Sequence, residues 1–223
     1  MRYKRAVIDS LNLSSYDIQN VFTKNDYIIE PIKSIGVFEP KRWRETFRKS
    51  LTKNIIEASI LHTNTGLEIP LKRFASSPQN QTIEFTGLHG YKERSKWLTK
   101  LLRDNWSQLQ DTRIMRLDVA IDYEKDIPTK VIKKLLKDRK AFKYANTTYY
   151  KTAKEKKKNS YMDIKIYNKA HQANLDFTCM RLEFVFKGSY FKKLQLKDFE
   201  NIKKKMEKTI KKIAGLSVKI EGI

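Results

Sequence analysis

The chain has 223 residues, 40% of them hydrophobic and 11% aromatic, so it can bury a substantial core and is not a disordered basic tail. Its 47 lysines and arginines outnumber 25 aspartates and glutamates, and the net charge of +22 predicts a polyanionic partner, nucleic acid before acidic lipid. No apolar run could span a membrane, the start MRYKRAVIDS lacks a signal-peptide core, and Cys179 is alone, so we expect a cytoplasmic protein with no membrane partner and no disulfide.

Alternating apolar and polar residues predict that most of the first third of the chain forms strands. A first strand over residues 3–9 precedes a short helix over 16–23, and further strands are expected over 26–38, 42–51 and 54–62. Two prolines and the SSPQN cluster predict a loop over 66–80. The next strand, 81–86, places Glu84 on the face opposite Ile83 and Phe85.

Helical spacing appears next, over residues 91–109, where Trp97, Leu98, Leu101, Leu102 and Trp106 form an apolar stripe. The remaining elements are expected as a strand over 114–123, a helix from Pro128, a hairpin of 141–151 with 160–169, a strand over 178–187 and a helix over 197–213. This order predicts an α+β fold with a mostly antiparallel central sheet and helices packed on one face. We expect a single domain, residues 1–223, with a motif core over about 82–187 and a basic helical appendage over 190–223.

The strand within SYMDIKIYNK places a tyrosine among charges. Met162, Ile164 and Ile166 share one face, whereas Tyr167 shares the other with acidic and basic side chains. A structural tyrosine would more naturally lie with the isoleucines. On the charged face, a phenol can meet solvent, a metal ion or a phosphate group.

Carboxylates alternate in the same way on three other predicted strands. Glu84, Asp118, Asp122 and Glu183 all lie on faces opposite the core residues of their strands. Carboxylates without histidine or cysteine neighbours suit a hard cation, Mg²⁺ or Mn²⁺. Asp118 and Asp122 are four residues apart, roughly 13 Å along a strand, so both are not expected to bind one ion. Asp118 is favoured as the ligand because it lies nearer the strand centre, and Asp122 stays open.

A metal ion would help a tyrosine to act as a nucleophile. A phenol has a pKa of about 10, so ionising it at pH 7 costs roughly 4 kcal/mol. A divalent ion together with Lys169 or Arg181 would favour the phenolate and stabilise negative charge that develops on phosphorus. Tyr167, a carboxylate-bound metal and a basic protein together predict attack on a DNA phosphodiester, giving a 5′-phosphotyrosine and a 3′-hydroxyl.

Simpler interpretations compete with this one. A solvated antiparallel sheet face carries charges in any case, and the acidic and basic residues could form cross-strand ion pairs. The loop from Lys151 to Lys158 could be solvated surface or a clamp on the DNA backbone. We expect DNA contacts from Lys151, Lys154, Lys156, Lys157, Lys158 and Lys165. A non-catalytic DNA- or RNA-binding regulator remains the alternative of a different class.

Four segments, TIEFTG (82–87), RLDVAID (116–122), KIYNKAHQ (165–172) and MRLEFVFK (180–187), resemble in residues and order the Rep_trans family of rolling-circle replication initiators, which is related to conjugative relaxases. The resemblance implies that Tyr167 becomes joined to DNA and that Glu84, Asp118 and Glu183 hold the metal, with Asp122 as a fourth candidate. It implies nicking and resealing at a single-stranded or cruciform origin, a homodimer, and a host helicase and polymerase as partners. A conjugative relaxase of the same chemistry is the closest alternative.

The chain departs from the family before the tyrosine strand. The family has an aromatic-Gly-x-Arg-x-Ser turn there, whereas this chain has TYYKTAKEKKKNS, without glycine. Tyr149 and Tyr150 therefore stay as alternative nucleophiles.

Overall fold

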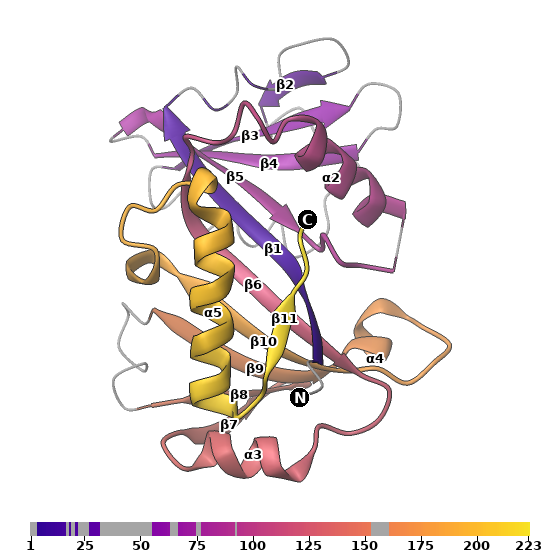
Figure 1. The fold of residues 1–223 in the computed structure, drawn as a ribbon. Coiled ribbons are helices and arrows are strands. Elements are labelled where there is room, and N and C mark those ends of the chain that lie inside the picture. Colours follow the sequence, from indigo (N-terminus) through magenta and orange to yellow (C-terminus); the bar gives the residue numbers. More distant parts are fainter. Residues whose placement is uncertain are drawn as a thin grey trace.

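One large sheet organises the protein, as the computed structural model shows (Figure 1). The structure describes residues 4–16, 18, 21, 27–31, 55–62, 67–74, 77–91, 93–152 and 161–223. Its strands are β1 Lys4–Tyr16, β2 Tyr27–Pro31, β3 Ile55–His62, β4 Leu67–Phe74, β5 Ser77–Thr86, β6 Arg113–Tyr123, β7 Lys140–Tyr144, β8 Thr147–Lys151, β9 Met162–Asn168, β10 Met180–Lys187 and β11 Val218–Ile220.

The strand order is β2-β3-β4-β5-β1-β6-β10-β9-β8-β7, and β11 pairs with β1. Every pairing between described strands is antiparallel except that of β1 with β11. The helices are α2 Glu93–Asp104, α3 Thr129–Leu136, α4 Lys169–Ala173 and α5 Phe199–Ala214, with short 3₁₀ turns at η3 Gly188–Tyr190 and η4 Leu196–Asp198. None of these helices is long and apolar enough to cross a membrane.

The core lies between the sheet and its helices. Apolar residues at every second position of β6, Leu117, Val119 and Ile121, are fully buried. The apolar stripes of the helices join the same cluster: Leu98, Leu101 and Leu102 from α2, Val131 and Leu135 from α3, and Ile202, Met206 and Ile210 from α5. Burying these stripes against one sheet face is what holds the helices in place. The α+β prediction, with helices on one face of a mostly antiparallel sheet, is confirmed.

Several boundaries differ from the sequence-based expectation. The predicted loop over 66–80 is wrong, because β4 and the first part of β5 cover most of it. Pro70 lies within β4 opposite Ser59 of β3, and the pairing of β4 with β5 begins at the next residue, Leu71. A proline is tolerated there because it removes only one donor. β1 runs on to Tyr16, so the expected helix does not begin there, and residues 17, 19, 20, 22 and 23 lie outside the described residues.

In the second half of the chain, the expected strand 141–151 is two strands. β7 and β8 form a hairpin, and β8 then pairs with β9 as predicted. α4 and β11 had no counterpart in the prediction, because five and three residues are too short for a period to show. The expected strand over 42–51, and Lys92 within the expected helix over 91–109, lie outside the described residues.

Candidate active site

The side of the sheet away from the helices carries the predicted site residues. Register places Tyr167 of β9 directly opposite Arg181 of β10, and Arg181 opposite Asp122 of β6. Two residues further along β10, and so on the same face, Glu183 lies opposite Lys165. Directly opposed residues of antiparallel strands project to the same face. Five neighbouring strands, β9, β10, β6, β1 and β5, therefore bring residues from distant parts of the sequence onto one surface.

Tyr167 is held by a carboxylate. Its hydroxyl donates a hydrogen bond of 2.8 Å to Oε2 of Glu183, and Nζ of Lys165 lies 2.6 Å from Oε1 of the same carboxylate. The ring is only 8% exposed, so the expectation that its face would leave it open to solvent is not met. Burial, and then the negative charge of Glu183, raises the pKa of the phenol well above its ordinary value. Tyr167 is therefore a neutral hydrogen-bond donor in this structure.

Glu183 also lies beside a second acid. Burial alone would raise the pKa of Glu183, but the ion pair with Lys165 and the hydrogen bonds from Lys165 and Tyr167 lower it. Asp118 is 1% exposed, and burial raises its pKa to about 7, with the negative charge of Glu183 adding to the effect and Arg116 partly offsetting it. A carboxyl group whose charge is destabilised by burial and by a neighbouring carboxylate is a place at which a proton or a cation binds favourably.

A guanidinium already provides positive charge at that place. Nε and Nη2 of Arg116 lie 2.8 Å and 2.6 Å from the two carboxylate oxygens of Asp118. Burial alone would lower the pKa of Arg116, yet the hydrogen bond with Asp118 and the charges of Asp118, Glu183 and Glu84 raise it. Arg116 thus lies among three of the four carboxylates predicted to hold a metal. Its side chain is 37% exposed, so it has a route outward to solvent.

Glu84 is linked to this group through β1. Nδ2 of Asn12 donates a hydrogen bond of 3.0 Å to Oε1 of Glu84. Asn12 lies opposite Glu84 on one side and opposite Arg116 on the other. Its amide oxygen is buried without a hydrogen-bond partner in the described structure. Burying an amide oxygen without a hydrogen bond costs free energy. Such an oxygen is also a ligand that a hard cation can bind.

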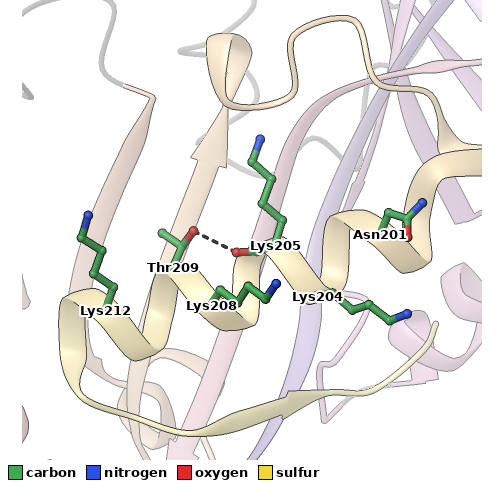
Figure 2. A pocket seen from close by; sticks show the side chains of 6 residues that line it. All are labelled: Asn201, Lys204, Lys205, Lys208, Thr209 and Lys212. Carbon is green, nitrogen blue, oxygen red and sulfur yellow. Dashed lines mark hydrogen bonds between the residues drawn. The ribbon is translucent and has the colours of Figure 1, made fainter.

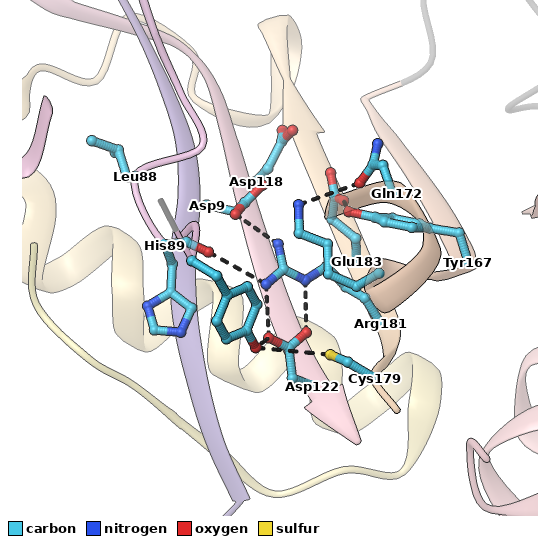
Figure 3. Close-up of polar contacts among 12 residues, drawn as sticks. Asp9, Leu88, His89, Asp118, Asp122, Tyr167, Gln172, Cys179, Arg181 and Glu183 are labelled. Atoms are coloured by element: carbon cyan, nitrogen blue, oxygen red, sulfur yellow. Dashed lines mark hydrogen bonds and ion pairs between the residues drawn. The ribbon is translucent and has the colours of Figure 1, made fainter. Parts of the chain in front are cut away.

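The fourth predicted ligand, Asp122, belongs to a different cluster (Figure 3). Arg181 contacts both of its oxygens, at 2.6 Å from Nε and 2.7 Å from Nη2, and contacts Oδ1 of Asp9 at 2.7 Å. Tyr91 donates a further hydrogen bond of 2.9 Å to Asp122. Although burial would raise it, the pKa of Asp122 is lowered by Arg181. Asp122 is thus paired with Arg181 through both oxygens, as Asp118 is with Arg116, and the choice of metal ligand between the two aspartates stays a prediction.

Arg181, predicted to assist the reaction, is completely buried between these aspartates. Its Nη2 also donates a 3.4 Å hydrogen bond to the carbonyl oxygen of His89. A guanidinium with these partners affects the neighbouring Tyr167 through its charge rather than by contact with a phosphate from solvent. The pKa of Tyr167 would be still higher without it.

Lys169 follows the tyrosine at the start of α4. The strand ends at Asn168, whose side chain accepts a hydrogen bond of 2.9 Å from the backbone N–H of His171 and so caps the helix. Nζ of Lys169 donates to Oε1 of Gln172 at 3.3 Å. Burial, and then the positive charge of Arg181, lowers the pKa of Lys169. The IYNK segment is therefore a strand end, a cap and a helix start, which fixes where Tyr167 lies.

The lysines expected to contact DNA divide into two groups. Lys165 forms the ion pair with Glu183, and Nζ of Lys151 lies 3.2 Å from Oδ1 of Asp163. Lys154, Lys156, Lys157 and Lys158 lie outside the described residues, so their role stays a prediction.

The two alternative tyrosines lie on opposite faces of β8. Tyr150 is 6% exposed within the core, and burial raises the pKa of its phenol. Tyr149 is on the site face, opposite Lys165, and its ring stacks on Phe142 at 5.2 Å. Tyr149 therefore remains the geometrically possible alternative, one strand away from Tyr167.

Sequence reasoning missed Asp9, Asn12 and Tyr91 as members of this surface. Asp9 and Asn12 belong to a strand that carries no recognisable motif. Asp9 is the extra residue of an irregularity in the pairing of β1 with β6, between Ile8 and Ser10. Burial raises the pKa of Asp9 in spite of Arg181. The polar residues Asp9, Ser10 and Asn12 interrupt an otherwise apolar strand, which is only a weak indication of a site. The residues that they contact follow from the strand order.

Among the residues that the structure describes, no three carboxylate, histidine or cysteine side chains come close enough to form a metal site. Metal binding therefore stays a prediction, with Asp118 and Glu183 as the adjacent carboxylate pair. Cys179 is buried, and its sulfur lies 3.8 Å from the Tyr91 hydroxyl.

A separate basic surface lies on α5, on the helix side of the sheet (Figure 2). The helix turns its apolar residues into the core and leaves a shallow groove lined by Asn201, Lys204, Lys205, Lys208, Thr209 and Lys212. Lys204, Lys208 and Lys212 recur every four residues, so they form one exposed stripe. This stripe adds to the positive field of the protein but is not part of the surface around Tyr167.

Comparisons with known proteins add little to this geometry. No family model matches the chain, and no curated protein matches it. Among solved structures, the chain is similar to a rolling-circle replication initiator protein from Geobacillus stearothermophilus, with 14% identity, a TM-score of 0.42, and coverage of 83% of this chain and 75% of that one. At that score and identity the likeness carries no functional argument.

Proposed function

We propose that this protein nicks and rejoins one DNA strand at an origin through Tyr167, in a metal-dependent reaction that starts rolling-circle replication. The observation that supports the proposal best is the chain of contacts from Tyr167 to Glu183 to Lys165, at 2.8 Å and 2.6 Å. A nucleophile hydrogen-bonded to a base, with a third group orienting the base, is the arrangement that covalent catalysis requires.

The proposed reaction is a transesterification at phosphorus. Glu183 accepts the phenol proton as the Tyr167 oxygen forms a bond to the phosphorus, and the bond from phosphorus to the 3′ oxygen breaks. The 3′ oxygen leaves and takes up the proton that Glu183 received, so the products are a 5′-phosphotyrosine and a 3′-hydroxyl. The reverse reaction, in which a 3′-hydroxyl attacks the phosphotyrosine, rejoins the strand and returns the proton to the phenol.

The resting structure by itself does not favour the first step. The pKa of Tyr167 is raised and that of Glu183 is lowered, so transfer of the proton between them is uphill. A bound Mg²⁺ or Mn²⁺ would supply the missing positive charge, stabilising both the phenolate and the charge on phosphorus. Asp118 and Glu183 are the adjacent carboxylates that would hold it, and Glu84 would have to come closer to them, because these three do not form a metal site in this structure. Arg116 would have to give up its ion pair with Asp118, and the unpaired amide oxygen of Asn12 fits such a set of oxygen ligands.

A labelled single-stranded origin oligonucleotide, incubated with the protein and Mn²⁺, tests the proposal. We expect a covalent adduct that survives SDS, that is absent from Tyr167→Phe and that persists in Tyr149→Phe. Mapping the DNA-linked peptide by mass spectrometry should identify Tyr167. An adduct that survives Tyr167→Phe would overturn the assignment of the nucleophile.

Two further variants separate chemistry from binding. Glu183→Gln and Asp118→Asn should abolish cleavage and leave oligonucleotide binding intact, because each removes a charge at the site while keeping its shape. Retained metal-dependent nicking in both would contradict the proposed roles. The resulting 3′-hydroxyl would prime a polymerase, and a helicase would open the duplex ahead of it. The homodimer stays a prediction from the family resemblance.

One observation favours a second candidate, a non-catalytic DNA- or RNA-binding regulator. Asp118, Asp122 and Glu183 are each ion-paired with a basic side chain, and Tyr167 is buried. A protein that only binds would need no more than this. Oligonucleotide binding without an adduct, in either Mg²⁺ or Mn²⁺, would support the regulator.

A further inference from the structure

A row of aromatic rings continues the site face beyond Tyr167, toward the edge of the described sheet. Thr147 of β8 lies opposite Tyr167 and also opposite Tyr144 of β7. In the next row, Tyr149 lies opposite Lys165 and opposite Phe142. All of these side chains project to the same face. Neighbouring strands are about 4.8 Å apart, so Tyr144, two strands from Tyr167, is roughly 10 Å from it.

The two rings on β7 are open to solvent. Tyr144 is 74% exposed and Phe142 is 42% exposed. Phe142 packs on Tyr149 with a centroid separation of 5.2 Å and an angle of 13° between the rings. Tyr149 therefore supports Phe142, whose ring stays partly exposed. Two positions along a strand span about 6.7 Å, so Phe142 and Tyr144 offer two separate ring faces.

Positive charge accompanies the rings. Nζ of Lys151 lies 5.7 Å from the centroid of Phe142, and Nζ of Lys165 lies 5.8 Å from that of Tyr167. Lys140 begins the same exposed strand as Phe142. Aromatic faces interleaved with lysines are the arrangement by which proteins bind unpaired nucleic acid, since every base has a face to stack and every linkage has a charge. A base paired within a duplex is already stacked and presents no such face.

We propose that Phe142, Tyr144 and Tyr149 form a stacking platform for unpaired bases, which holds a single strand of DNA against the Tyr167 site. This proposal rests on the proposed function, because that function is what makes Tyr167 the place where the strand must be held. It adds the form of DNA that is bound and the residues that bind it. The platform selects a melted or extruded strand over a duplex. It places stacked bases within a few nucleotides of the phosphate next to Tyr167.

The alternative occupant is a second copy of this chain. β7 ends the described strand order, and an exposed strand with apolar side chains can pair with another copy. Lys140 and Lys143 of β7 argue against that, because two copies brought edge to edge would place like charges together. Single-stranded nucleic acid, a polyanion with exposed bases, complements both features.

Fluorescence anisotropy with three labelled 12-nucleotide probes tests the platform: a single strand, its duplex, and the same strand with abasic positions. The test variant is Phe142→Leu combined with Tyr144→Leu. Tyr161→Leu is the matched control, because Tyr161 is also 42% exposed but lies at the opposite end of β9 from Tyr167. Tyr144→Phe is a second control that keeps the ring.

Removing an aromatic ring on which a base stacks weakens binding by about 5- to 150-fold for each base. We therefore expect the double variant to bind the single strand at least about tenfold more weakly, with duplex binding unchanged. The wild-type protein should bind the abasic strand as weakly as the double variant binds the intact single strand. Both control variants should bind the intact single strand with the affinity of the wild type. An unchanged single-strand affinity would refute the platform, as would an equal loss for single strand and duplex.

Sedimentation velocity on the same samples addresses the alternative occupant. A wild-type dimer that dissociates in the double variant would overturn the proposal in favour of self-association. The platform and the nicking reaction fail independently. An adduct that forms normally while the double variant binds like the wild type sinks the platform alone, and selective single-strand binding without any adduct sinks the nicking reaction alone.

Discussion

Removing the buried Arg181 should destabilise the protein strongly and make its stability depend on pH in a defined direction. Arg181 is fully buried and bonds two aspartates, Asp9 at 2.7 Å and Asp122 at 2.6 Å and 2.7 Å. Arg181→Met keeps much of the volume but leaves the buried Asp9 and the half-buried Asp122 without their cation. Breaking a buried ion pair in this way costs about 3–5 kcal/mol.

The sign of the pH effect follows from the two aspartates. In the wild type the pKa of Asp122 is lowered, so its contribution to stability is present above its unfolded pKa and is lost as the pH falls. In Arg181→Met the cation that lowers both pKa values is gone, so burial should outweigh the remaining partners, Tyr91 at Asp122 and Lys169 at Asp9, and both pKa values should rise above the unfolded value of about 4. The folded variant then binds more protons than the unfolded chain, so its stability falls as the pH rises. Its deficit should be larger at pH 8 than at pH 5, by about 1.4 kcal/mol for each unit by which the pKa of either carboxyl rises above about 5.

Urea denaturation at pH 5 and pH 8 measures both effects, with fluorescence of Trp97 and Trp106, which pack against the core, as the signal. Adding Asp9→Asn and Asp122→Asn to Arg181→Met should restore most of the loss at pH 8. Lys96→Met, which removes an exposed ion pair with Glu93, serves as the control and should leave the denaturation midpoint unchanged. A loss below about 1 kcal/mol, or one that is equal at both pH values, would refute this reasoning.

Three other variants test the site and the backbone. Arg116→Gln should tighten Mn²⁺ binding by about tenfold or more in calorimetry, because it removes a cation from among Asp118, Glu183 and Glu84, and an unchanged affinity would place the metal elsewhere. Ala145→Gly should stabilise the protein by roughly 0.5 kcal/mol in thermal unfolding, since Ala145 has a φ of 48° in the β7–β8 turn, and a loss would show that its methyl group matters more than its strain. Gly215→Ala should cost about 1 kcal/mol, because Gly215 ends α5 with a φ of 70°, and a neutral result would mean that the helix end relaxes.

The sequence by itself was enough to predict which side of each motif strand faces the core. Leu117, Val119 and Ile121 are buried, and Arg116 and Asp118 project to the other face, as alternation indicates. Face assignment is a local property, because successive side chains of any strand point in opposite directions. The same holds for the helices, whose buried residues follow from spacing alone.

What those polar faces contact was decided only by the tertiary structure. Arg181 and Asp9 are 172 positions apart, and Asn12 and Glu84 are 72 apart, yet each pair forms a hydrogen bond. Such contacts depend on the order β5-β1-β6-β10-β9 and on an irregular pairing at Asp9, which no local pattern encodes. Burial of the Tyr167 ring is decided in the same way. Side chains from neighbouring strands surround the ring. Alternation along its own strand therefore predicts the face on which Tyr167 lies, but not how far the ring is exposed.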